Sequence, residues 1–216
     1  MTTAPVVPKT PRRIVAMAAV AAVACVPLVA PYAALDPATS RIAVTGSVHY
    51  ALLVAHIGTA AVALVLGPLQ FVPRIRARRA VHRAIGRSYL LLGVVPSALV
   101  GIPLAWLSGN PLTQVGLTIP FVGWLVTAAL AVAAIRRGDV AAHRRWMIRN
   151  YALTFLAITA RVLVPVLLLG VLASGGASDG VPALIGSLVP VGQVAGWVVN
   201  LAVVEWMFRR ERVRTR

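Results

Sequence analysis

The sequence predicts an all-α polytopic membrane protein with a six-helix transmembrane bundle, and three observations predict it. The chain has 216 residues, of which 59% are hydrophobic, and its mean hydropathy is +0.86. Soluble domains are usually less than half apolar, so this composition indicates a membrane protein. Six apolar runs follow one another along the chain, each long enough to cross a hydrocarbon core of roughly 30 Å. The basic residues gather between these runs.

The predicted organisation is a short cytoplasmic tail at 1–13, a transmembrane domain at 14–208 and a basic cytoplasmic tail at 209–216. The six helices are expected at residues 14–35, 47–72, 88–107, 115–135, 146–173 and 181–208. The first run follows basic residues as a signal peptide does, but its length and the five later runs favour an uncleaved helix. Pro27 and Pro31 should kink or end this helix. The pair Gly67-Pro68 should bend the second helix.

The distribution of charge predicts the orientation of the chain. All but two of the 21 basic residues lie in the two tails, in the loop between the second and third helices, and in the loop between the fourth and fifth. Cytoplasmic loops are enriched in Lys and Arg, so both termini should face the cytoplasm, as six crossings require. A net charge of +16 would also suit nucleic acid. Its location between spans argues against that partner.

The basic loops are expected to lie against anionic lipid headgroups, where each arginine contributes on the order of 1 kcal/mol. Membrane lipids are therefore the expected partners, and a homo-oligomer is compatible with the sequence. The excess of arginine over lysine is typical of a GC-rich bacterial genome, so the expected location is the bacterial plasma membrane. The arginines assigned to the membrane surface are Arg74, Arg76, Arg78, Arg79, Arg83, Arg87, Arg144, Arg145 and Arg149.

One arginine, Arg161, lies inside the fifth apolar run. In a continuous helix it would lie about 18 Å beyond Arg149, near the middle of the membrane. A cation at that depth costs at least ~2.5 kcal/mol, so we expect partners within the bundle, either as a structural clamp or as a ligand site. Asn200 matches Arg161 best in height, whereas Glu205 lies closer to the cytoplasmic end. The polar residues expected around Arg161 are Asn150, Thr154, Gln193, Asn200, Glu205 and His56.

The histidines raise the alternative of a haem protein, because haem iron takes axial imidazoles. His82 and His143 both lie in or beside the inner basic loops and could hold one b-type haem between them. His49 and His56 lie on one helix, so they cannot clamp a single haem from opposite faces. A hydrogen-bonded polar residue at a helix contact is the structural interpretation of His56.

A second alternative is a divalent-ion site at the cytoplasmic edge. Asp139 and His143 are four residues apart, a spacing that can chelate on a helix, and His82 and Glu205 could complete the site. The structural interpretation is that Asp139 caps the incoming helix.

No signature of a catalytic triad, a P-loop or a dinucleotide site is visible, and the single cysteine, Cys25, cannot form an internal disulfide. We therefore predict no catalytic residues and favour a non-enzymatic membrane protein whose polar interior binds or passes a small ligand, lipid or ion. The alternative is a redox membrane protein that binds haem b or a quinone through its histidines.

Three stretches carry a family resemblance: HIGTAAVALVLGPLQF at 56–71, HRAIGRSYLL at 82–91, and DVAAHRRWMIRNYALTFLAITARVLVP at 139–165. Together they resemble the bacterial multi-pass membrane family catalogued as domain of unknown function twenty-three-zero-six, over residues 47–208. The resemblance implies an integral membrane protein and assigns no chemistry. It marks as signature positions His56, His82, His143, Trp146, Arg149, Tyr151 and Arg161.

Overall fold

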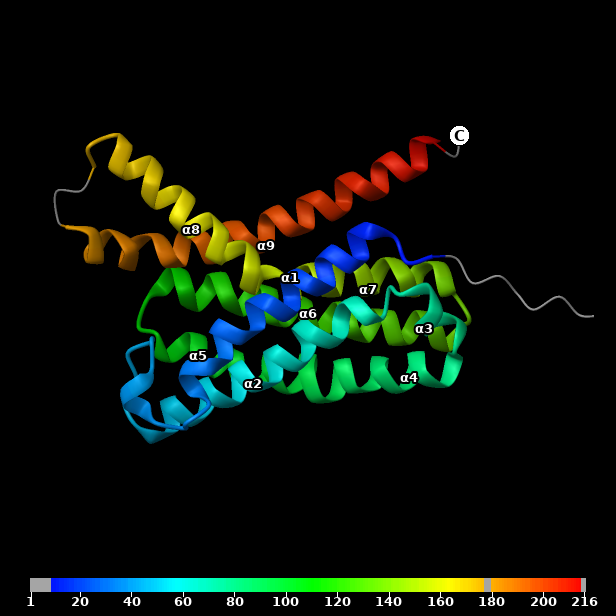
Figure 1. The fold of residues 1–216 in the computed structure, drawn as a ribbon, viewed down its shortest axis with the longest axis horizontal. Helices are drawn as coiled ribbons and strands as arrows, with labels where there is room; N and C mark the ends of the chain where they lie inside the picture. Colours follow the sequence, from blue (N-terminus) through cyan, green and yellow to red (C-terminus); the bar gives the residue numbers. More distant parts are fainter. Residues whose placement is uncertain (1–8, 177–179, 215–216) are drawn as a thin grey trace, which may run out of the picture. The chain divides into compact units, whose positions relative to one another are not determined.

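The computed structural model describes residues 9–176 and 180–214, and all regular structure in this part of the chain is helical. This confirms the predicted all-α class. The elements, drawn in Figure 1, are α1 (Arg12–Val29), η1 (Ala30–Tyr32), η2 (Pro37–Thr39), α2 (Ser47–Leu69), α3 (Pro73–Ala77), α4 (Arg79–Ser88), η3 (Tyr89–Val94), α5 (Val95–Leu107), α6 (Pro111–Arg136), α7 (Val140–Thr154), α8 (Leu156–Ala173) and α9 (Val181–Arg214). The element η3 is a π-helix.

Six described stretches are long and apolar enough to cross a membrane. They are Arg12–Tyr32, Ser47–Leu69, Arg79–Leu107, Pro111–Arg136, Leu156–Ala173 and Val181–Val213. Large apolar side chains on these helices point outward, among them Val23 and Val26 of α1, which are 72% and 67% exposed. Exposed apolar surface of this extent marks contact with lipid or with another protein. The prediction of six membrane-spanning helices is thus confirmed, whereas the cytoplasmic placement of the termini stays a prediction.

The chain forms two compact units, Met1–Ser97 and Ala98–Arg216. In the first unit, α1 packs on α2, and α2 packs against the π-helix η3. The two elements approach closely at Gly93, where an added Cβ would lie 2.9 Å from both the nitrogen and the Cβ of Ala63. Only glycine allows the two backbones to come this close.

In the second unit, α6 packs on α7 and α9, and α8 packs on α9. The α8–α9 contact uses two glycines four residues apart, Gly192 and Gly196. A Cβ added at Gly196 would lie 2.8 Å from Cδ1 of Leu156 and 3.3 Å from the nitrogen of Ala160, and one added at Gly192 would meet Val164. Small residues at this spacing let membrane helices pack at the level of their backbones.

The inner basic loops of the prediction are largely helical in the structure. The first contains α3 and α4, and α7 starts at Val140. The carboxylate of Asp139 accepts a hydrogen bond from the amide of Ala142 at 2.8 Å, which caps α7. At the C-terminal end, α9 continues to Arg214. The described part of the predicted basic tail is therefore helical, and residues 215–216 and 1–8 lie outside the described residues.

The predicted fifth helix, 146–173, is interrupted at Phe155 and forms α7 and α8. Figure 1 shows that these two helices run in different directions. The candidate span starts at Leu156, so Arg161 lies within the second turn of α8. The estimate of 18 Å from Arg149 assumed one straight helix. It does not hold for the observed pair of helices.

Candidate functional site

A bidentate ion pair joins α7 to α9. The Nε of Arg149 donates to Oε1 of Glu205 at 2.6 Å, and its Nη2 donates to Oε2 at 3.0 Å. Two parallel charge-assisted bonds fix the relative orientation of a guanidinium and a carboxylate. This pair therefore fixes the spacing and rotation of the two helices at this level.

Aromatic rings on both helices hold the same guanidinium. The Cζ of Arg149 lies 4.7 Å from the ring centroid of Trp146 and 4.9 Å from that of Phe208. Both distances are within the range of cation–π attraction. Only 21% of the Arg149 side chain is exposed, against 41% for Glu205. The guanidinium of Arg149 thus faces Glu205 of α9, and its predicted place at the basic membrane surface stays a prediction.

A groove of about 280 Å³ lies beside this ion pair, between α6, α7 and α9. Its volume is near the lower end of ligand pockets, about 300 Å³. The residues that line it are Ile119, Pro120, Gly123, Thr127, Arg149, Leu153, Trp197, Leu201 and Glu205. The indole N–H of Trp197 donates to the carbonyl of Gly116 at 2.9 Å, so the tryptophan offers the groove mainly its apolar ring. The wall is thus apolar, with two opposite charges.

A buried hydrogen-bond network supports the groove from behind. Asn150 is fully buried, and its Nδ2 donates to the carbonyl of Trp124 at 2.7 Å and to the hydroxyl of Thr127 at 2.8 Å. The indole of Trp124 donates to Oγ1 of Thr154 at 3.1 Å. Asn150 and Thr154 therefore do come together, but with two α6 residues that the sequence interpretation missed. The sequence signal that could have indicated this network was Thr127, a polar residue three positions after Trp124 within an apolar run.

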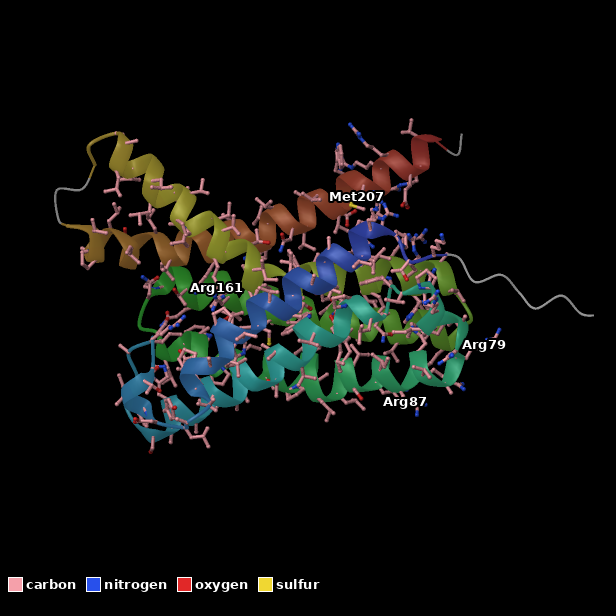
Figure 2. The ribbon with its side chains drawn as sticks, viewed as in Figure 1. Arg79, Arg87, Arg161 and Met207 are labelled. Atoms are coloured by element: carbon pink, nitrogen blue, oxygen red, sulfur yellow. The ribbon has the colours of Figure 1, made fainter. Side chains whose placement is uncertain are left out.

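Arg161 hydrogen-bonds through its guanidinium to the backbone of its own helix. Its side chain is exposed, and its Nη1 donates to the carbonyl of Ala157 one turn earlier in α8, at 2.7 Å. Figure 2 marks it on α8. The preceding residue, Ala160, is the one that faces Gly196 of α9. Since successive helical residues are rotated by about 100°, Arg161 lies beside this contact instead of within it.

The expected partners of Arg161 on α9 bond elsewhere. Asn200 accepts from the hydroxyl of Thr159 at 2.8 Å and donates to the carbonyl of Ala152 at 2.9 Å. Glu205 pairs with Arg149. The buried Oε1 of Gln193 has no hydrogen-bond partner among the described residues. The predicted cluster of these residues around Arg161 stays a prediction.

The histidines make local hydrogen bonds within their own units. In the first unit, Nδ1 of His56 lies 3.0 Å from the carbonyl of Ser97 and 3.1 Å from its hydroxyl. In the second, Nδ1 of His143 lies 2.9 Å from the carbonyl of Ala131. His82 is half-buried on α4 of the first unit. The contact of His56 is the helix contact we expected, and the haem hypothesis stays a prediction.

A divalent-ion site at the cytoplasmic edge was predicted from Asp139, His143, His82 and Glu205. No group of three or more His, Cys, Asp or Glu side chains suited to a metal gathers within residues 9–176 and 180–214. The carboxylate of Asp139 caps α7, and that of Glu205 holds Arg149. Both acids are therefore committed to structural contacts.

The other arginines assigned to the membrane surface are exposed, as Arg79 and Arg87 on α4 illustrate in Figure 2. Arg144 lies 4.0 Å from the carboxylate of Glu211. Their contact with lipid headgroups stays a prediction. The full exposed set is Arg74, Arg76, Arg78, Arg79, Arg83, Arg87, Arg144 and Arg145.

The model of a family described as "Predicted membrane protein (DUF2306)" matches residues 53–208. The comparisons with curated proteins and with solved structures gave no match. The groove, the ion pair and the buried network all lie within the matched residues. The match covers more than half of the chain, and the chain therefore belongs to this family of predicted membrane proteins.

Proposed function

We propose that this membrane protein binds a single small amphiphile in the groove between α6, α7 and α9. The observation that carries the proposal is an apolar groove with the Arg149–Glu205 pair in its wall. The apolar body of the ligand packs against Leu153, Trp197 and Leu201. Its polar head meets the ion pair.

The head of the ligand is an anion. A guanidinium has five N–H donors, and two of those of Arg149 go to Glu205, which leaves donors for a second acidic group. Arg209 and Arg212 also lie close enough to act electrostatically on Glu205. The local charge is therefore net positive, which favours a carboxylate or phosphate head.

This proposal assigns ligand contact to Arg149 and not to Arg161. Arg161 is not among the residues that line the groove. Arg149 is a well-fixed cation, since a carboxylate and two aromatic rings hold it in one orientation. A preorganised charge binds an anion with less loss of side-chain entropy than a mobile one.

The test fills the groove by the substitution Gly123→Leu. A Cβ at Gly123 would lie 3.5 Å from Cδ1 of Leu153, an ordinary contact, so the fold accepts the first carbon and the remaining atoms occupy the groove. The probe is dansyl-labelled undecanoic acid, whose emission rises in an apolar site. We expect saturable binding of one probe per wild-type chain in detergent, and affinity at least about tenfold lower in the variant.

The matched control is Gly170→Leu on α8, where an added Cβ meets no atom within 4 Å. This variant should bind the probe as the wild type does. Equal binding by Gly123→Leu and the wild type would show that the probe does not use the groove, and the proposal would then be wrong.

A further inference from the structure

The last turns of α9 form a second hollow, of about 320 Å³, lined by Trp206, Arg209, Arg210 and Val213. These residues have the spacing i, i+3, i+4, i+7, so their Cα atoms lie along one stretch of the helix surface. The groove uses Trp197, Leu201 and Glu205 of the same helix. Since Trp206 is rotated by about 100° from Glu205, the centre of the hollow is on a different face from the groove.

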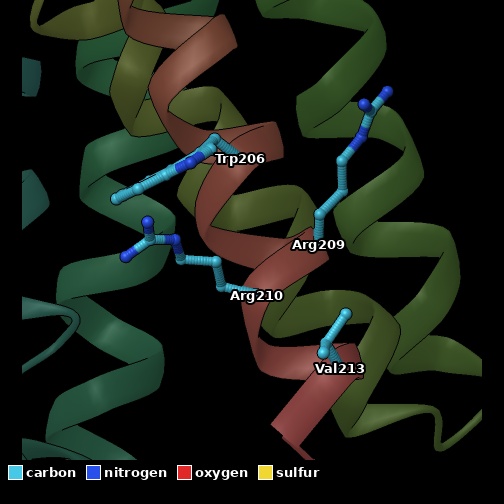
Figure 3. A pocket seen from close by; sticks show the side chains of 4 residues that line it. All are labelled: Trp206, Arg209, Arg210 and Val213. Atoms are coloured by element: carbon cyan, nitrogen blue, oxygen red, sulfur yellow. The ribbon is translucent and has the colours of Figure 1, made fainter.

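The centre of this hollow is a stacked pair. The guanidinium carbon of Arg210 lies 3.9 Å from the ring centroid of Trp206. Figure 3 shows the two side chains together on one side of α9, whereas Arg209 extends to the other side. Stacking on an aromatic face fixes the plane of the guanidinium and leaves its N–H edge available. No acidic side chain pairs with Arg210 in the described part of the chain.

The place of this pair along α9 fits the surface of a membrane. The candidate span that contains it ends at Val213, and tryptophan and arginine side chains concentrate where apolar spans meet the headgroups. Trp206 is 52% exposed and Val213 75%. Exposed apolar atoms next to a fixed guanidinium match a ligand that carries a phosphate beside glycerol and acyl carbons. A free anion would bind the guanidinium but leave the apolar atoms of Trp206 and Val213 in water.

We propose that Trp206 and Arg210 bind the headgroup phosphate of an anionic phospholipid. Arg210 donates two parallel N–H bonds to phosphate oxygens, and Trp206 holds the guanidinium and packs against the glycerol. The planar guanidinium can donate two parallel N–H bonds to one phosphate, whereas the ammonium group of a lysine cannot. This site is independent of the groove.

The experiment titrates the full chain, in neutral detergent, with phosphatidylglycerol or phosphatidylcholine and counts bound lipids by native mass spectrometry. We expect the wild type to bind phosphatidylglycerol about tenfold more tightly than phosphatidylcholine. Arg210→Ala and Trp206→Ala should each abolish most of this preference. Arg210→Lys keeps the charge and should still lose several-fold. Both side chains are exposed, so these variants should fold.

The matched control is Arg87→Ala, which removes one exposed arginine from α4. Its preference should change by less than about twofold. If Arg87→Ala and Arg210→Ala lost the lipid preference equally, the preference would come from general surface charge. If Arg210→Ala kept the preference, Arg210 would not form a lipid site. Either result overturns the proposal.

Two further measurements separate this site from its alternatives. Inorganic phosphate at millimolar concentration should not displace phosphatidylglycerol, and displacement would identify a free-phosphate site and overturn the lipid assignment. Arg210→Ala should still bind dansyl-undecanoic acid, and Gly123→Leu should keep the preference for phosphatidylglycerol. The two proposals can therefore fail separately.

Discussion

Replacement of Gly93 by leucine should destabilise the first unit by at least about 3 kcal/mol, the upper end of the usual cost of overpacking. The new Cβ would lie 2.9 Å from the nitrogen of Ala63 and 3.0 Å from its Cα. These are backbone atoms, so relief requires α2 and η3 to separate. The measurement is unfolding in mixed detergent followed by circular dichroism.

The matched control for this prediction is Gly58→Leu on α2, where an added Cβ meets nothing within 4 Å. It should unfold close to the wild-type midpoint. If Gly93→Leu were as stable as Gly58→Leu, the close contact between α2 and η3 would not exist in the protein.

Replacement of Asn150 by leucine should destabilise the second unit by about 2 kcal/mol. The change removes donors to the carbonyl of Trp124 and the hydroxyl of Thr127 from a fully buried position. Buried acceptors left without a donor cost about 1–3 kcal/mol each in soluble proteins, and hydrogen bonds between membrane helices average about 0.6 kcal/mol. The same unfolding assay measures the loss.

The control for Asn150 is Thr118→Val, also within the second unit. The hydroxyl of Thr118 donates only to the carbonyl of Gln114 in its own helix, so its loss breaks no contact between helices. Equal midpoints for Asn150→Leu and Thr118→Val would mean that the α6–α7 network contributes nothing to stability.

The number and helical class of the spans were predictable from the sequence because an apolar run in lipid can adopt few secondary structures. Every backbone polar group must bond within its own segment, which makes a long apolar run a helix. The inner basic segments were misjudged as loops since their arginines interrupt the long apolar runs that mark the spans. Their arginines and alanines are nevertheless good helix formers, and Asp139 was a visible cap for α7.

The pairing of Arg149 with Glu205 was not predicted, because the sequence shows neither the interruption at Phe155 nor which face of α7 meets α9. No glycine or proline marks that position. The estimated depth of Arg161 assumed a straight helix from Arg149, and that estimate directed the search for partners to Arg161. The sequence also does not show that the guanidinium of Arg161 donates a hydrogen bond to a carbonyl of its own helix.

The most direct test of the proposed function compares Arg149→Gln with Arg161→Gln for the affinity of dansyl-undecanoic acid. Each variant removes one positive charge, and glutamine at position 149 can still hydrogen-bond Glu205. We predict that Arg149→Gln binds about tenfold more weakly, whereas Arg161→Gln stays within about twofold of the wild type. Wild-type affinity in Arg149→Gln, or a larger loss in Arg161→Gln, would contradict the assignment of the ligand to the groove.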